Sequence, residues 1–420
     1  MSMPRAAIWP ALIVFGVLVL LPVGRASEAP FAIGGIVAII VIARRSLDLR
    51  DAACRLVLAL FACYWLPALL SSAAAVEPSR TWSTIATTLR FLPFALFALW
   101  ALRRAQIWPA ATAAVAAVVL LWTIDAYVQI TTGHSLGGAP ESERLSGIFG
   151  AGNLKLGPVL AVLSPFFLLA ARERYRRRGL VFAALVLIAP ILLSGARAAW
   201  LSYALVCLLI AWHETRDLRR LLVVLLVLAL GVGTIGALAL HDSTGFGNRI
   251  ERSLLALRGT EVAIDEASAG RISIWRTASR MLAAHPLTGV GVRGFRYAYP
   301  KYAAPGDRFV DTTSDLGASH AHQIVLEVLS ETGIVGLVCW IAGLVFALRA
   351  WWRADAAARM RARAPALALI AMCFPLNTHL AFYSAWWGLL FWWLLALYCA
   401  ALGAREDGVV SARALRPATG

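Results

Sequence analysis

Apolar runs long enough to cross a bilayer recur along almost the whole chain, and no other feature limits its fold as strongly. A helix of about 20 apolar residues spans the hydrocarbon core, because it satisfies its own backbone hydrogen bonds there. The sequence therefore predicts an all-α polytopic membrane bundle of about 12 transmembrane helices. We expect these spans at residues 7–24, 30–43, 55–73, 84–102, 107–127, 153–171, 179–194, 196–212, 219–240, 323–348, 364–380 and 383–402.

The composition agrees with a membrane protein and argues against a soluble one. Hydrophobic residues make up 60% of the chain and charged residues only 15%. A net charge of +16 would suggest nucleic acid as the partner of a soluble protein. Here the arginines lie between apolar runs, so they indicate membrane lipids as partners and no nucleic acid. The six cysteines are scattered singly and contain no CxxC motif, which is typical of small apolar packing residues.

The arginines also orient the spans. They cluster after every second apolar run, which predicts cytoplasmic loops there and both termini in the cytoplasm. We expect nine transmembrane helices in residues 1–240, one large outside loop at 241–322, three further helices at 323–402 and a cytoplasmic tail at 403–420. The clustered arginines include Arg44, Arg45, Arg103, Arg104, Arg172, Arg174, Arg216, Arg219, Arg349, Arg353 and Arg405.

The large loop contains two stretches that we expect to be helical, NRIERSLLALR and EVAIDEASAGRISIWRTASRMLAAHP. In the second, Ile272, Trp275, Ala278 and Leu282 recur at helical spacing. This pattern predicts an amphipathic helix that lies along the membrane or caps the bundle.

Two arginines on the predicted outside face are candidates for binding an anion. Arg197 lies in LLSGARAAWLS between two apolar runs, where a charge faces a cavity or a partner, unless it snorkels to the interface. Arg271 opens the amphipathic stretch. Guanidinium is planar, permanently charged and bidentate, which suits phosphate oxygens.

Three further arginines are weaker candidates. Arg276 and Arg280 share one helical face, and we favour a solvated or headgroup-binding role for both. Arg90 lies in the outer half of a predicted span. It either meets the same cavity as Arg197 or pairs with a carboxylate such as Asp125.

The stretch SHAHQIVLEVLSETGIVGL at 319–337 contains the candidate bases, His320 and His322. A neutral imidazole is the usual general base near neutral pH. HxH is also a metal-ligand spacing, but no outside carboxylates or thiols complete such a site. If the pair is helical, only one ring faces the site. Glu327 and Glu331 share a helical face and either orient His322 or pair with an arginine.

The segment TGVGVRGF at 288–295 is too loosely patterned for a nucleotide-binding loop and has no preceding strand. We expect a tight turn whose glycines approach a ligand or the bundle. Tyr297, Tyr299 and Tyr302 follow it, and we favour an interfacial aromatic belt over sugar stacking for them.

Four of these segments, in this order, resemble the O-antigen ligase and polymerase superfamily of bacterial inner membranes. They are RLSGIFGAGNLKLG, LLSGARAAWL, GRISIWRTASRMLAAHPLTGVGVRGF and SHAHQIVLEVLSETGIVGL. The resemblance covers most of the chain. It implies functional arginines at Arg197 and Arg271 and a catalytic His322, with His320 as the alternative base. Gln323 stands where the family commonly has Asn, and we count it with Arg90 and Arg276 among candidate substrate contacts.

The resemblance implies an inverting glycosyltransferase. The donor would be a glycan on undecaprenyl diphosphate, and the acceptor would be a sugar hydroxyl of lipid A–core. Arg197 and Arg271 would clamp the leaving diphosphate in place of a divalent cation, so we expect neither a metal nor another cofactor. The active site would face the periplasm.

The sequence is compatible with three functions. We favour an O-antigen ligase, because the chain has one large late loop. An O-antigen polymerase or an O-linked protein glycosyltransferase of the same superfamily would share the donor chemistry. A transporter for a lipid-linked anion is weaker, because neither a sequence repeat nor paired midplane charges are evident.

Overall fold

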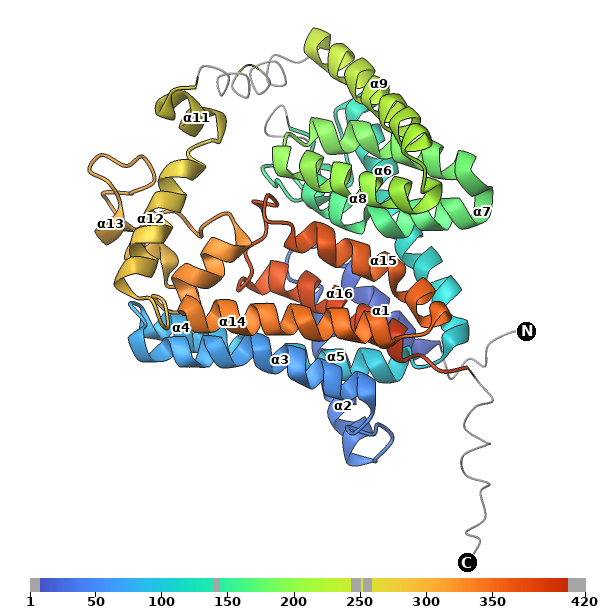
Figure 1. Cartoon of the computed structure of the whole chain (residues 1–420), viewed down its shortest axis with the longest axis horizontal. Helices are drawn as coiled ribbons and strands as arrows, with labels where there is room; N and C mark the ends of the chain where they lie inside the picture. The colour runs from blue at the N-terminus through green and yellow to red at the C-terminus, as the bar shows by residue number, and fades with distance from the viewer. Residues whose placement is uncertain (1–7, 139–143, 243–250, 252–258, 407–420) are drawn as a thin grey trace, which may run out of the picture.

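The computed structural model describes residues 8–138, 144–242, 251 and 259–406, and these residues form an all-α protein (Figure 1). Its α-helices are α1 Trp9–Val19, α2 Glu28–Ala43, α3 Ala52–Leu70, α4 Pro78–Thr88, α5 Phe91–Ala101, α6 Trp108–Thr132, α7 Leu156–Leu193, α8 Arg197–Thr215, α9 Leu218–Asp242, α11 Glu261–Ala267, α12 Arg271–Ala284, α13 Phe295–Tyr302, α14 Ile324–Arg353, α15 Ala356–Cys373 and α16 Ala385–Gly403.

Every predicted span overlaps a helix, but the number of twelve is not reproduced. Within the described ranges, six helical segments are long and apolar enough to cross a membrane: Ala52–Ala74, Pro78–Ala101, Ala105–Thr132, Arg197–Thr215, Ile324–Arg353 and Ala385–Gly403. The helices α1 and α2 are apolar but shorter than a full span. Three arginines in the first half of α15 make that helix too polar to qualify by composition.

The helix α7 covers two predicted spans, 153–171 and 179–194, because it is a hairpin rather than one rod. Arg176 leaves the helical region at φ 58° and ψ −151°. The two ends of α7 lie together, since a Cβ on Gly157 would be 2.0 Å from Ser194 Oγ. The two halves are therefore antiparallel, as two consecutive membrane spans would be.

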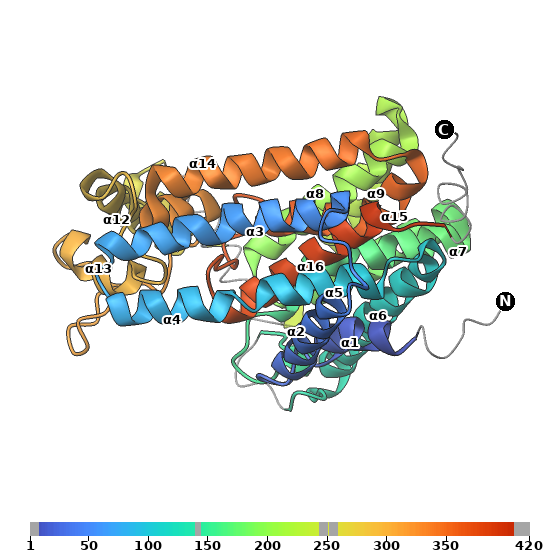
Figure 2. The same cartoon turned by 90° about the horizontal axis from the view of Figure 1, so that it is seen from below.

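The helices α11, α12 and α13 lie together at one end of the molecule, and the start of α1 and the end of α16 lie toward the other (Figures 1 and 2). We call α11–α13 the cap. The loops predicted to be cytoplasmic meet at the opposite end. There, Arg405 pairs with Asp51, and its amide donates to Arg103 O at 2.8 Å. The cap and these loops, which the distribution of arginines predicts on opposite sides of the membrane, therefore lie at opposite ends of the bundle.

The core of the bundle is built around α16, whose side chains are almost all buried. Trp392 and Trp393 are completely buried, and Trp392 stacks on Phe91 of α5 with ring centroids 6.0 Å apart. Large aromatic side chains contribute most of the apolar area that such a core removes from its surroundings. α16 therefore holds α5 and α3 on one side and α15 on the other.

The cap differs in detail from the predicted amphipathic segment. The expected single helix is broken at Ala269 and Gly270, which have φ values of 59° and 80°, so α11 and α12 are separate. The buried face of α12 consists of Ile274, Thr277, Ala278 and Met281, rather than the predicted Ile272–Trp275–Ala278–Leu282 stripe. The other predicted helix, NRIERSLLALR, lies outside the described residues.

The tyrosine prediction is wrong for Tyr299. Its ring is completely buried inside the cap, and its hydroxyl is 3.1 Å from Asp307 Oδ2. Tyr302 lies beside His285, with 2.9 Å between the hydroxyl and Nε2. These two side chains pack the cap rather than form an interfacial belt.

Candidate active site

A break in α14 sets the position of the glycine-rich segment 288–295. Gly333 has φ 67° and ψ −164°, so the helical hydrogen-bond ladder stops there. The carbonyls of Ser330 and Glu331 are released and accept from the amides of Val290 and Gly291 at 2.9 and 3.1 Å. The glycine-rich segment 288–295 therefore approaches the bundle, which was one of the two predicted outcomes.

The two histidines are not helical, and the prediction that only one ring could face the site is wrong. α14 begins at Ile324, and His322 has a left-handed φ of 53°. This turn brings the rings of His320 and His322 together, with centroids 3.9 Å apart. Gln323 is the N-cap of α14, because its Oε1 accepts from Leu326 N at 2.6 Å.

A main-chain carbonyl fixes the tautomer of His322. Its Nδ1 is 2.8 Å from Thr378 O, in the loop between α15 and α16. A carbonyl can only accept, so Nδ1 carries the proton and Nε2 presents a lone pair. Asn377 holds this loop against the end of α15, because its Nδ2 donates to Met372 O at 3.1 Å. The geometry suits a general base at Nε2.

A third imidazole, His379, joins the pair. Burial, followed by the positive charge of Arg271, lowers its pKa to about 4. Burial also lowers the pKa of His322, an effect that the Thr378 bond opposes and Arg271 strengthens. Burial, followed by the effect of His322, lowers the pKa of His320 well below its usual value. These shifts all favour the neutral form of the three imidazoles.

The two predicted anion-binding arginines lie close to each other. Arg271 opens α12 directly after the left-handed Gly270, and Arg197 opens α8 two residues after Gly195, which has φ 70°. The side chain of Arg197 also donates to Ala267 O in α11. Burial and, to a smaller extent, the positive charge of Arg197 together lower the pKa of Arg271 to about 10. An anion between the two guanidinium groups would relieve this repulsion.

The other predicted substrate contacts lie elsewhere. Arg90 pairs with Glu28 through both nitrogens, with Nη2 3.0 Å from Oε1, and does not reach Asp125. Asp125 instead accepts from Leu136 N at 2.7 Å. Arg276 lies on the exposed face of α12. Gln323, as the N-cap, uses its amide oxygen on the protein itself.

Glu327 and Glu331 do not orient His322, contrary to one of the two expectations. Both are completely buried, and Glu331 Oε2 accepts from Arg293 N at 2.8 Å. The positive charge of Arg293 acts on both carboxylates. The main-chain amide of Arg293 therefore connects the glycine-rich loop to α14.

His379 was not among the residues predicted from the sequence; it lies in the PLNTHLAF segment between α15 and α16. It lines a small open pocket together with residues 151–155 and Trp387. Beside the pocket, Lys155 Nζ lies 4.4 Å from the ring centroid of Trp386. A histidine in the last residues of the predicted span 364–380 was the available signal. Among the described residues, no group of three or more His, Cys, Asp or Glu side chains is arranged to hold a metal ion.

Residues 182–341 match the family model described as O-Antigen ligase. The match runs from the second half of α7 into α14 and contains Arg197, Arg271, His320 and His322. It confirms the resemblance stated from the motifs, over these residues. No curated protein matches the chain.

Proposed function

We propose that this protein is an O-antigen ligase of a bacterial inner membrane. It would transfer a glycan from undecaprenyl diphosphate to a sugar hydroxyl of lipid A–core, with inversion and without a metal, at the periplasmic face. The observation that carries the proposal is the cluster of Arg197 and Arg271 with His322. Thr378 O holds the proton of His322 on Nδ1, so the lone pair lies on Nε2. The family match over 182–341 supports the same class of chemistry.

The reaction follows from this cluster. The acceptor hydroxyl oxygen attacks the anomeric carbon, and its proton passes to His322 Nε2. The bond from that carbon to the diphosphate oxygen breaks, and the leaving diphosphate keeps the electron pair. Arg197 and Arg271 stabilise the charge that grows on this leaving group, so their contribution increases toward the transition state. A single displacement inverts the anomeric centre.

The pocket beside His379 supports a place for a sugar near the base. Loop residues 151–155 provide polar backbone groups, and Trp387 provides an apolar wall. Sugar rings combine both kinds of surface, so this pocket suits the acceptor or the first donor sugar. His320 is the alternative base, because its Nε2 is buried and has no hydrogen-bond partner among the described residues.

The central test uses purified protein, an undecaprenyl-diphosphate glycan and rough lipopolysaccharide, without added metal. We expect a ladder of products from the wild type and loss of at least 10²-fold in turnover from His322→Ala, with donor binding retained. His134→Ala is the matched control, because that imidazole also contacts a main-chain carbonyl, Thr132 O at 3.0 Å, but is exposed. Full activity of His322→Ala, with loss in His320→Ala, would move the base to His320.

The acceptor distinguishes the proposed ligase from its relatives. The same preparation is offered rough lipopolysaccharide, a second donor molecule or an acceptor protein. Transfer to lipid A–core alone supports the ligase. Chain extension would indicate a polymerase, and glycosylation of the protein would indicate an O-linked protein glycosyltransferase. Chelation that abolishes transfer, with restoration by a divalent ion, would refute the metal-free clamp.

A further inference from the structure

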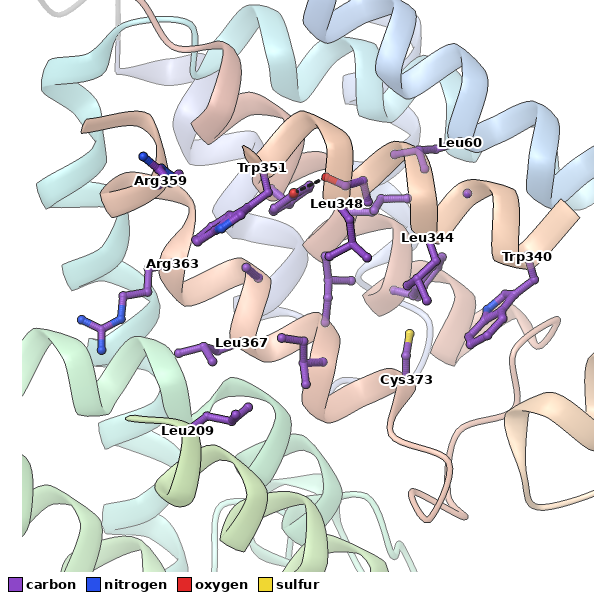
Figure 3. Close-up of a pocket in the computed structure, with 18 of the residues that line it drawn as sticks. Leu60, Leu209, Trp340, Leu344, Leu348, Trp351, Arg359, Arg363, Leu367 and Cys373 are labelled. Carbon is purple, nitrogen blue, oxygen red and sulfur yellow. Dashed lines mark hydrogen bonds between the residues drawn. The ribbon is translucent and has the colours of Figure 1, made fainter. Parts of the chain in front are cut away.

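A large apolar cavity of about 820 Å³ lies between α14 and α15, away from the histidine cluster (Figure 3). One wall is a stripe of α14 at helical spacing, Trp340, Leu344, Leu348 and Trp351. The facing wall comes from α15, and side chains of α3, α8 and α16 complete the lining.

The cavity exists because α14 and α15 pack on different partners. α14 packs against α3, whereas α15 packs against α16 and α7, although only Ala354 and Asp355 join the two helices. The cavity is open to the side, since Leu344, Leu348 and Ile370 on its walls keep 44–48% of their surface exposed. In a bilayer, such an apolar opening between helices is filled by hydrocarbon chains rather than by water.

One end of the cavity is cationic. Arg216, Arg359 and Arg363 line it, together with His213. Arg363 is only 14% exposed, and its Nη2 is buried without a hydrogen-bond partner among the described residues.

The nearby carboxylates satisfy only part of this cationic end. Glu214 pairs with Arg363 Nη1 through Oε1 at 3.7 Å, and its Oε2 accepts from Arg172 Nε at 2.7 Å. Asp355 accepts from Ala358 N at the start of α15. The cationic end therefore keeps hydrogen-bond donors for an anion.

The other end of the cavity reaches Phe382 and Tyr383, in the loop that also carries His379. The cationic end is thus the end far from the active site, near the α14–α15 turn. A lipid whose phosphate lies at Arg359 and Arg363 belongs to the leaflet opposite the site. Its acyl chains would run along α14 toward the active-site loop.

We propose that this cavity binds an anionic glycerophospholipid, with its phosphate on Arg359 and Arg363 and its acyl chains between α14 and α15. Guanidinium groups match phosphate oxygens, and basic pockets between membrane helices on the cytoplasmic side select anionic headgroups. This lipid is distinct from the glycan donor, whose diphosphate we place at Arg197 and Arg271.

The test measures lipid binding by native mass spectrometry of detergent-purified full-length protein, with phosphatidylglycerol and phosphatidylcholine of identical chains as probes. We expect the wild type to prefer phosphatidylglycerol, and the double variant Arg359→Gln/Arg363→Gln to bind it about thirty-fold more weakly. The matched control is Arg349→Gln/Arg353→Gln, which removes two exposed charges beside the same turn and should bind like the wild type.

A second variant, Leu348→Trp, fills the cavity and should weaken binding of both lipids without removing a charge. Equal affinity of the wild type for the two lipids, or equal losses in the two double variants, would overturn the proposal. Displacement of phosphatidylglycerol by undecaprenyl phosphate that depends on Arg197 and Arg271 would assign the cavity to the donor instead. The assay measures lipid binding and not glycan transfer, so its result does not depend on whether the proposed ligase activity is found.

Discussion

The substitution Gly333→Ala tests whether the break in α14 holds the active-site framework together. An alanine there must adopt a left-handed φ of 67°, which costs about 1–2 kcal/mol. Its Cβ would lie 2.2 Å from Leu287 O and 2.3 Å from Leu287 C. These are main-chain atoms, so the loop before the glycine-rich segment has to move.

That movement weakens the hydrogen bonds from Ile334 N to Pro286 O at 2.8 Å and from Val335 N to Leu287 O at 3.3 Å. Each contributes about 0.5–1.5 kcal/mol. The combined loss in the free energy of unfolding is about 2–5 kcal/mol, which corresponds to a fall in Tm on the order of 5 °C. Activity should fall further, because Leu287 leads into the glycine-rich segment that carries Arg293, and the residues of α14 before Gly333 lead back to His322.

Tryptophan fluorescence during heating of the detergent-solubilised protein measures the change. Gly343→Ala is the matched control on the same helix, because its Cβ would meet Cys63 Cβ at 3.5 Å, an ordinary contact. Alanine also favours a helix over glycine by about 1 kcal/mol, so this variant should keep or raise Tm. Equal Tm values for Gly333→Ala and Gly343→Ala would refute the account of the break.

Three further predictions concern the charged cluster. Burial and the charge of Arg271 lower the pKa of His322, so kcat/KM should stay high as pH falls through 6.5 and should decline only below that value. An inflection above pH 6.5 would contradict this expectation. Arg271→Lys keeps the charge but loses the bidentate guanidinium, so kcat/KM should fall about 10–100-fold. The control Arg280→Lys should match the wild type. Equal kcat/KM values for Arg271→Lys and the wild type would assign Arg271 a structural role. His379→Gln should raise the KM of one sugar substrate about tenfold with little change in kcat, and unchanged kinetics would remove this residue from the site.

The helical segments could be predicted from the sequence because hydropathy alone decides which residues avoid water in a bilayer. Their boundaries could not. The hairpin at Arg176 lies inside an arginine-rich run, and hydropathy does not show where such a run reverses direction. The same limit applies to α11 and α12, whose separation depends on the left-handed conformation of Ala269 and Gly270.

The site residues divide in a similar way. Arg197, Arg271 and His322 were predicted from local motifs, and the structure brings them into one electrostatic cluster. Arg90 was predicted as a substrate contact because it lies in the outer half of a predicted span, but in the structure it pairs with Glu28. His379 was missed because its position depends on the packing of α15 and α16, which no local pattern contains.

The contact between His322 and Thr378 has a consequence for how the protein is made. The proposed base lies just before α14, but the carbonyl that orients it belongs to the loop between the last two helices, α15 and α16. A ribosome-bound chain that has inserted everything up to α14 would hold both arginines and both adjacent histidines, but His322 would lack the carbonyl that fixes its tautomer. Under the proposed function, transfer begins only after the final helical pair enters the membrane, and we expect a chain truncated after Arg353 to bind the donor without transferring it.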